Sequence, residues 1–291
     1  MSSGEIRAAA EAHMVPMTEE ELAVDPQERR RTVLHRGRYW REAFTGLFEP
    51  VHPMARLTAW EATRPSPRCW GYHAALAESS MAEANSSMPM HLLADLGGFS
   101  VDSLSSNRRY HLRRSQRQVT YVQVAGSGPL ESGGYEVFRS AQARTGNPYR
   151  TVRSEAEFLS EMKWYTSRPS AIVLAGIVDD RIGGWIAGYA VDRTAYIEIV
   201  DIATEVISTQ MGTGLHFAFV EACRRSPGIR EIAHSPHIPE DAALVVFKEG
   251  IGFPVVNVPS KAWLLPVADT LIRWRKPFLH YRLTGRMSPK G

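Results

Sequence analysis

The sequence has few cysteines, no long apolar run and no dense group of metal-ligating residues. Cys69 and Cys223 are its two cysteines in 291 residues, too few for a disulfide framework and without metal-ligand spacing. The first residues contain no apolar core of signal-peptide length, and no stretch approaches the roughly 20 apolar residues that span a bilayer. These absences predict a cytoplasmic protein with no membrane partner, no metal and no tightly bound cofactor.

Acidic residues are missing from three segments, 29–41, 103–118 and 270–291. The chain carries 34 Lys and Arg against 31 Asp and Glu, and half of the basic residues fall in these segments. The remainder is therefore acidic and the basic charge is concentrated, as in chains that bind a polyanion. Each segment also contains aromatic residues. The alternative for any one segment is a solvated helix face.

Two of these segments supply candidate contacts with RNA phosphates. In 103–118, Ser and Asn residues suited to helix capping precede a basic helix. The candidate nucleic-acid-binding residues are Arg108, Arg109, Arg113, Arg114, Arg117, Arg273, Arg275 and Lys276.

The residue composition and the predicted elements divide the chain into five segments. Residues 1–28 predict a loose, mostly acidic helical arm, and 29–105 predict a Trp-, Met- and Pro-rich domain with short helices. A basic linker helix over 106–118 leads to a domain over 119–265, and a basic tail follows over 266–291.

The order of elements is clearest within 119–265. A strand at 119–125 precedes two helices, at about 132–145 and 154–166. Three strands over 170–204, separated by short Asp- and Arg-containing turns, predict an antiparallel meander without room for a crossover helix. The first parallel connection therefore follows the meander. The remaining elements are a helix at 213–225, a strand at 229–235, a helix at 240–250 and a last strand over 254–265.

This order and two short motifs resemble the GNAT acyltransferases. The segment "FKEGIGFPVV" resembles the family's segment before its final strand. The segment "TQMGTG" stands where the family has Arg or Gln, two residues, Gly, any residue, then Gly or Ala. The resemblance covers 119–265, half of the chain. It implies an α/β (α+β) fold, a GNAT fold with a mixed, partly antiparallel central sheet in the C-terminal half.

A glycine-containing turn opens the helix at 213–225. Free N–H groups and the helix dipole stabilise an anion at such a helix start. In acyl-CoA-dependent relatives the motif cradles a pyrophosphate, helped by a cation or amide where this chain has Thr209. No Lys or Arg lies between Arg193 and Arg224, and the alternative is a simple helix-entry turn. The implied donor-binding residues are Ile202, Thr204, Thr209, Gly212, Thr213 and Gly214.

Many GNAT enzymes have a Tyr in the helix before the last strand, and this chain has Lys248 there. Phe-Lys followed by Gly-Phe resembles the Fem-type ligases, whose GNAT-like domain takes an aminoacyl group from tRNA. The matching Lys of that family is thought to stabilise charge at the ester carbonyl and the leaving ribose oxygen. The Arg-rich helix also resembles the Fem-type segment before a second GNAT unit, which implies that 29–105 is a degenerate first unit. The alternative for Lys248 is an exposed helix residue.

Two carboxylates of the strand at 194–204 are candidate bases. Alternation places Glu198 on one face with Tyr196, Val200 and Ile202, and Asp201 on the other. We favour Glu198 slightly, because an isolated carboxylate in an apolar strand requires a partner or a raised pKa. Asp201 could instead cap the following loop.

Two histidines, His234 and His237, follow at the end of the next strand. Either could accept a proton near neutral pH, although such residues are more often hydrogen-bonded loop histidines. The implied catalytic residues are Lys248, Glu198, Asp201 and His234.

Three functions remain open. The favoured one is an aminoacyl-tRNA-dependent N-acyltransferase that moves an amino acid onto a small amine or peptide, as in cell-wall bridge or natural-product assembly. The second is an acyl-CoA-dependent N-acyltransferase, which "MGTG" favours and Thr209 disfavours. The third is a non-catalytic RNA-binding protein on a decayed GNAT fold, in which Glu198 and Lys248 are dispensable. An exposed last strand could also pair across a homodimer.

Overall fold

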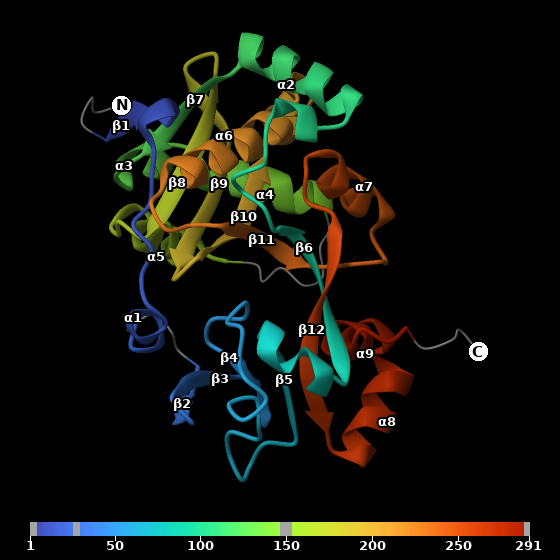
Figure 1. Cartoon of the computed structure of the whole chain (residues 1–291). Coiled ribbons are helices and arrows are strands. Elements are labelled where there is room, and N and C mark those ends of the chain that lie inside the picture. The colour runs from blue at the N-terminus through green and yellow to red at the C-terminus, as the bar shows by residue number, and fades with distance from the viewer. Residues whose placement is uncertain (1–4, 26–29, 146–152, 288–291) are drawn as a thin grey trace. The chain divides into compact units, whose positions relative to one another are not determined.

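The computed structural model describes residues 5–25, 30–145 and 153–287. The chain forms two compact units, each assembled from separate stretches. Unit 1 comprises Met1–Pro16, Leu93–His234 and Gly250–Phe253. Unit 2 comprises Met17–Leu92, Ser235–Glu249 and Pro254–Gly291. The colour gradient of Figure 1 shows early and late residues together in unit 2.

Unit 1 is built on a mixed sheet with the strand order β1-β7-β8-β9-β10-β11. Neighbours from β1 to β10 are antiparallel, and β10 and β11 are parallel. Asp179, Asp180 and Asp192 adopt positive φ in the turns between β8, β9 and β10, a conformation that Asp tolerates. The predicted meander and parallel connection are confirmed. The strands are β1 Ile6–Ala8, β7 Thr120–Val124, β8 Ala171–Val178, β9 Arg181–Val191, β10 Thr194–Ile202 and β11 Glu231–Pro236.

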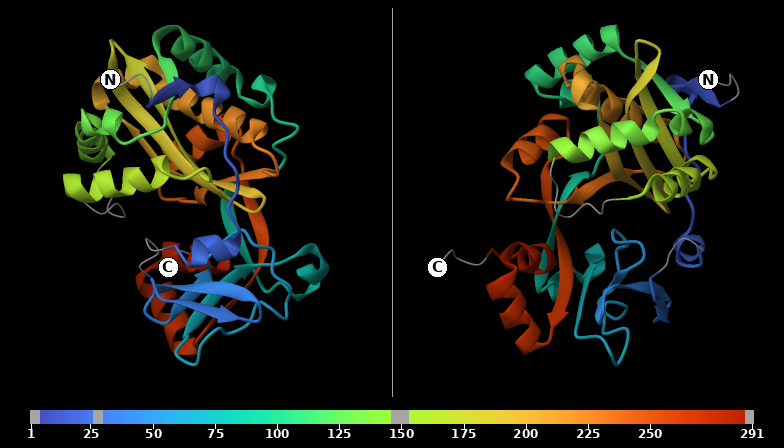
Figure 2. Two further views of the ribbon diagram at one scale, coloured as in Figure 1. Left: turned by 90° about the vertical axis from the view of Figure 1, so that its left-hand side faces the viewer. Right: turned by 180° about the vertical axis from the view of Figure 1, so that it is seen from behind.

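Helices cover both faces of this sheet (Figure 2). On one face, Phe158 packs on Trp185 of β9, with ring centroids 5.5 Å apart. On the other, a Cβ at Gly188 of β9 would lie 2.7 Å from the ring of Phe219 and collide with the carbonyl oxygen of Tyr196, so the close packing of α6 on β9 requires glycine. The helices of unit 1 are α2 Ser106–Gln118, α3 Gly128–Glu131, α4 Gly134–Thr145, α5 Glu155–Thr166 and α6 Met211–Arg225.

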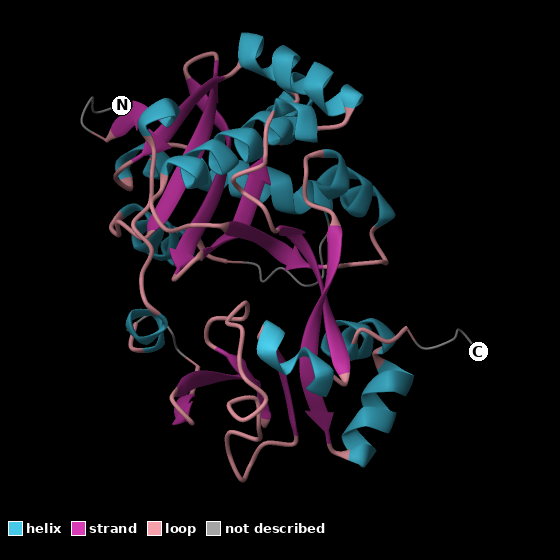
Figure 3. Ribbon diagram, viewed as in Figure 1, coloured by secondary structure: helices cyan, strands magenta, loops and turns pink. Residues whose placement is uncertain are grey.

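Unit 2 contains a second run of strands, ordered β6-β12-β5-β4-β3-β2. Trp40, Phe48, Leu57 and Tyr72 are core residues of this unit. The short helices predicted over 29–105 are wrong, because most of the regular structure there is strand, joined by loops and 3-10 turns (Figure 3). β5 is buried at every residue and β6 at its last six, so these strands show no alternation of apolar and polar residues in the sequence. They are β2 Thr32–His35, β3 Arg38–Phe44, β4 Leu47–Pro50, β5 Gly71–Ala75 and β6 Ser86–Leu93.

The last strand, β12 (Val255–Leu264), lies between β6 and β5. Its first part pairs with β6 and its end pairs with β5, both antiparallel. The strand is therefore not the last in the strand order, although each of its two parts has a strand partner on one side, and pairing across a homodimer stays a prediction. Three helices of the C-terminal part are α7 Ala242–Gly250, α8 Pro266–Arg275 and α9 Pro277–Thr284, the last two within the segment predicted as a basic tail.

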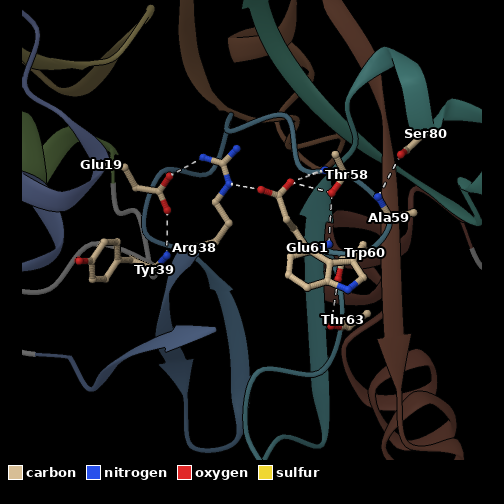
Figure 4. A network of polar contacts seen from close by, with 9 residues as sticks. All are labelled: Glu19, Arg38, Tyr39, Thr58, Ala59, Trp60, Glu61, Thr63 and Ser80. Atoms are coloured by element: carbon tan, nitrogen blue, oxygen red, sulfur yellow. Dashed lines mark hydrogen bonds and ion pairs between the residues drawn. The ribbon is translucent and has the colours of Figure 1, made fainter. Parts of the chain in front are cut away.

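Ion pairs hold α1 (Glu19–Ala23) against β3. Arg38 lies between the carboxylates of Glu19 and Glu61, 3.0 Å from each (Figure 4). Burial raises the pKa of Glu61, but hydrogen bonds from Thr58 and the charge of Arg38 bring it below its ordinary value. The described part of 1–28 is therefore not a loose helical arm, since β1 also pairs with β7.

Candidate active site

The strands β10 and β11 separate after a short paired stretch. Thr194–Tyr196 pair with Glu231–Ala233, whereas β10 runs on to Ile202. In the described register, the rest of β10 has partners on β9 and none on β11. The parallel pair therefore opens toward its carboxyl ends, where ligands bind in open α/β sheets.

The N-terminus of α6 follows this opening. Gln210, at φ 63°, turns the chain into the helix, and Gly212–Gly214 lie in its buried first turn, not in a turn before it as predicted. The hydroxyl of Thr213 has no hydrogen-bond partner among the described residues. Thr209 brings no charge, and its hydroxyl donates to the carbonyl of Val206 at 2.6 Å. Backbone N–H groups and the helix dipole remain as the attraction for an anion.

Gly214 is required by packing. A Cβ there would collide with the ring and hydroxyl of Tyr121 on β7. Tyr121 is hydrogen-bonded to Ser115 of α2, and burial raises the pKa of Tyr121 to about 12. The glycine thus lets α6, α2 and β7 approach one another. Its role in donor binding stays a prediction.

A cation reaches the predicted donor loop from α4. The guanidinium of Arg144 donates to the carbonyl of Ile202 at 3.3 Å. The N–H of Thr204 donates to the hydroxyl of Ser140 at 3.0 Å, which ties the loop to the same helix. Sequence reasoning missed Arg144, because it lies 58 residues before Ile202 and no motif joins them.

A β-bulge changes the faces of β10. The register against β9 shifts at Glu198, which is the extra residue of the bulge. Paired residues on neighbouring strands share a face, and Tyr196 pairs with Tyr189 while Asp201 pairs with Trp185. Tyr196 and Asp201 therefore share a face, and the strict alternation predicted beyond Glu198 is wrong.

The two candidate carboxylates differ in exposure. Glu198 is exposed, whereas Asp201 is completely buried on the face that carries Trp185. Burial, and then the charge of Glu198, hold the pKa of the Tyr165 hydroxyl well above its ordinary value. Glu198 can therefore meet a ligand from solvent, while Asp201 cannot do so without movement.

His234 forms a buried pair with His216 of α6. Their Nε2 atoms are 3.0 Å apart, and Nδ1 of His216 lies 2.6 Å from the carbonyl oxygen of Gly212. Because a carbonyl only accepts, Nδ1 of His216 carries a proton, and in the neutral pair His234 Nε2 donates to His216. Nδ1 of His234 is then an acceptor, the form that a base requires. The pair lies on the α6 face, opposite Asp201.

In unit 2, Lys248 of α7 is buried. Its side chain is 3% exposed and its Nζ donates to the hydroxyl of Ser235 at 2.6 Å. Burial lowers the pKa of Lys248 to about 8, although the charge of Asp241 acts to raise it. Ser235 has φ 68°, an uncommon conformation for a residue with a side chain. The alternative of an exposed helix residue is wrong, and the catalytic role stays a prediction.

His237 belongs to unit 2 as well. Its Nδ1 lies 2.7 Å from the hydroxyl of Tyr281 on α9, and its ring meets His91 of β6 edge-on at 5.6 Å. Burial lowers the pKa of His237, and the charge of Lys248 contributes in the same direction. Sequence reasoning missed Tyr281 and His91, because only the fold brings them to this loop.

The basic residues of α2 fall into two groups. Arg108 and Arg109 are half-buried, and Arg109 donates to the carbonyl of Leu104 at 3.0 Å. The others point to solvent at the i, i+3, i+4, i+7 spacing of one helix face. This exposed face carries Tyr110, Arg113, Arg114 and Arg117.

The remaining candidates for nucleic-acid binding are exposed at the end of α8 in unit 2. Arg273 lies 4.0 Å from the carboxylate of Asp269, and the guanidinium of Arg275 lies 5.3 Å from the ring centre of Trp274. Lys276 follows directly after the helix. These three cations therefore accompany an exposed aromatic ring.

A pocket of about 350 Å³ lies in unit 1, between the β8–β9 turn, α3, α4 and the loop after β10. Its charged lining residues are Glu136, Asp179, Asp180, Arg181 and Glu205. The excess of carboxylates disfavours a phosphate and suits a cationic group. No group of three or more His, Cys, Asp or Glu side chains in the described ranges is placed to hold a metal ion.

Comparisons with family models and with curated proteins find no match. Solved structures do match. FemX shares 7% identity, with a TM-score of 0.57 over 92% of this chain and 96% of its own. The C-terminal domain of a protein described as a lysylphosphatidylglycerol synthetase from Agrobacterium fabrum shares 12%, with a TM-score of 0.56 over 88% and 89%. L-PGS from Bacillus licheniformis shares 10%, with a TM-score of 0.52 over 95% of each chain.

The chain thus has the fold of Fem-type, GNAT-like proteins, and the expected fold class is confirmed. At 7% and 12% identity the likeness is one of fold. It extends over 92% of the chain in the comparison with FemX, whereas the sequence resemblance covers half. The strands of 29–105 therefore belong to the shared fold.

Proposed function

We propose that this chain transfers an aminoacyl group from aminoacyl-tRNA to the amine of a small molecule or peptide. One observation carries the proposal: Lys248 is a buried cation at the position where the Fem-type ligases have their Lys. A buried ammonium is expensive to desolvate, so its retention indicates a role that needs the charge. The names of two structural neighbours, a protein described as a lysylphosphatidylglycerol synthetase and L-PGS, support transfer of an amino acid.

The proposed chemistry is aminolysis of an ester. The amine attacks the ester carbonyl, the bond to the ribose oxygen breaks, and the amine loses a proton. The ammonium of Lys248 stabilises the negative charge that develops on the carbonyl or leaving oxygen. Glu198, which is exposed to solvent, is our preferred proton acceptor, and the buried His234 and Asp201 are alternatives that would have to move to reach the amine.

The exposed arginines of α2 are the proposed tRNA contacts. Arg113, Arg114 and Arg117 can contact phosphates, and Tyr110 can stack on an exposed base. Since tRNA is a cytoplasmic donor, we place the protein in the cytoplasm.

For the acceptor, we propose the carboxylate-lined pocket of unit 1. Four of its five charged residues are acidic, which attracts an amine in its cationic form. The substrate class is therefore an amine, or the amino end of a peptide, of net positive charge.

The acyl-CoA-dependent alternative draws on the start of α6, where the turn at 212–214 and Arg144 together could hold a pyrophosphate. Thermal shift separates the donors. CoA or acetyl-CoA should raise Tm only if the protein binds CoA, by an amount that grows with ligand concentration. No shift with CoA, together with a shift by aminoacyl-tRNA, would support the first proposal.

Lys248→Met tests the proposal directly. We expect amine-dependent loss of the aminoacyl group from tRNA to fall at least about 100-fold, while tRNA binding stays within twofold. Lys163→Met, an exposed lysine of α5, is the matched control. Activity of Lys248→Met within a few-fold of wild type would refute the catalytic role. A wild type without transfer activity would instead favour the non-catalytic RNA-binding protein.

The pKa of Lys248 predicts the pH dependence. With a pKa of about 8, the side chain is mostly protonated at pH 7 and neutral above pH 8. Transfer should therefore fall as pH rises above about 8, by roughly tenfold per unit. Because the folded pKa lies below the unfolded value of 10.5, burial of Lys248 disfavours folding most below pH 8, and this cost fades between pH 8 and 10.5. Lys248→Met should thus leave Tm at pH 7 unchanged or higher.

A further inference from the structure

The outer side of α8 carries an exposed apolar stripe. Val267, Leu271 and Trp274 are 81%, 47% and 74% exposed. At about 100° per residue, the three side chains lie within about 60° of one another on the helix. The helix has no buried residue, so the stripe is not part of the core of unit 2.

The opposite side of α8 faces its own unit. Asp269, roughly opposite Val267 on the helix, accepts a hydrogen bond from His280 of α9 at 2.9 Å. Figure 1 shows α8 beside α9 and β12 at the edge of unit 2. Because the polar side is used to pack on α9, the apolar side looks outward. A contiguous exposed stripe of this kind marks an interaction site.

Basic side chains lie near the stripe. Arg275 borders it, about 40° from Leu271 around the helix, whereas Arg273 lies about 100° from Trp274, toward Asp269. Arg273, Arg275 and Lys276 are exposed, and the one acidic residue of the helix, Asp269, is already engaged by His280 and Arg273. The guanidinium of Arg275 lies 5.3 Å from the ring centre of Trp274, beside the stripe. Long basic side chains can extend from such a position to charged groups above an apolar layer.

We propose that α8 docks this protein onto an anionic lipid surface, with the stripe at the headgroup boundary and the three cations at the phosphates. Exposed aliphatic and Trp side chains beside Arg and Lys are the composition of helices that lie in a membrane interface. Aliphatic Val267 and Leu271 offer nothing to RNA, which is bound through phosphates and stacking. A symmetric pairing of two copies would bring the basic flanks together.

This proposal differs from the sequence-based expectation of no membrane partner. That expectation rests on spanning length, and no helix of the described residues is long and apolar enough to cross a membrane. A helix that lies on a surface needs only one apolar face.

Vesicle flotation tests the proposal with the full chain. Wild type should float with vesicles of phosphatidylcholine mixed with phosphatidylserine, and much less with phosphatidylcholine alone. Val267→Gln/Leu271→Gln/Trp274→Gln should weaken binding at least about tenfold, and so should Arg273→Gln/Arg275→Gln/Lys276→Gln, which should also remove the salt dependence. Trp60→Gln, at a 62% exposed Trp of the same unit, is the matched control and should bind as wild type.

Several outcomes would overturn the proposal. One is that the wild type does not bind anionic vesicles. Another is that the variant with Val267, Leu271 and Trp274 replaced by Gln is folded and floats as well as wild type. Gel shifts with total tRNA and equilibrium sedimentation address the other partners. Loss of RNA binding in both variants without vesicle binding would assign α8 to RNA, and loss of a dimer in the stripe variant alone would assign it to a second copy. Vesicle binding is measured without a transfer assay, so the test of membrane docking is independent of the proposed transferase function.

Discussion

The β2–β3 hairpin and α2 are both basic in sequence, yet the structure uses their arginines differently. In the hairpin, Arg38 is held by Glu19 and Glu61, and Arg41 lies 2.8 Å from Glu49. In α2, the face with Arg113, Arg114 and Arg117 points to solvent. A segment without acidic residues can therefore still be neutralised, because the carboxylates come from elsewhere in the chain. Local charge counts alone cannot separate a structural cation from one presented to a partner.

The largest expected effect on stability is at Arg38. Arg38→Met should leave two partly buried carboxylates without their shared partner and lower the free energy of unfolding by about 2–3 kcal/mol. Urea unfolding measures the change. Arg30→Met, whose side chain is 51% exposed in its pair with Glu49, should change stability by less than about 0.5 kcal/mol. Equal effects of the two substitutions would show that burial of Arg38 does not make its ion pairs more stabilising than the exposed pair of Arg30.

Substitutions on the exposed face of α2 should change RNA binding and leave stability unchanged. Arg113→Gln/Arg114→Gln/Arg117→Gln should leave the urea midpoint unchanged but weaken tRNA binding about tenfold and reduce its salt dependence. Loss of tRNA use without loss of activity on a minimal aminoacyl ester would identify these residues as tRNA contacts. Equal loss with both donors would refute that role. The matched control is Arg193→Gln/Arg224→Gln/Arg230→Gln, three exposed arginines of unit 1 outside α2.

The smallest effect is expected at Ser235, beside the buried cation Lys248. Ser235→Gly keeps the positive φ but removes the hydroxyl that accepts from Lys248. The charged form of Lys248 loses a hydrogen bond, so the alkaline fall in transfer should move to lower pH, by less than about one unit. Ser235→Asn retains an acceptor and tolerates the conformation, and should restore the profile. An unchanged profile in Ser235→Gly would show that the hydroxyl does not act on Lys248.

The order of elements over 119–265 was predictable because its signals are local. Nearly continuous apolar, β-branched runs mark the strands, and Asp residues mark the turns at positive φ. The start of α6 was likewise predictable from the Gly212–Gly214 turn. The face of Asp201 was not, since a single bulge at Glu198 reverses the alternation behind it. The contact of Arg144 with Ile202 and that of His216 with His234 could not be predicted either, because each joins two separate elements.

The sequence by itself determined the fold class, the antiparallel meander β8–β10 with its parallel neighbour β11, and the position of Lys248, because turn residues and motif spacing act over a few residues. Tertiary structure alone decided which charges are buried, which are paired and which face outward. Lys248 is buried, Arg38 and Arg41 are paired with carboxylates, and the stripe of α8 is exposed. The physical reason is the same in each case: desolvation and Coulomb energies depend on neighbours in space, and those neighbours lie far away along the chain.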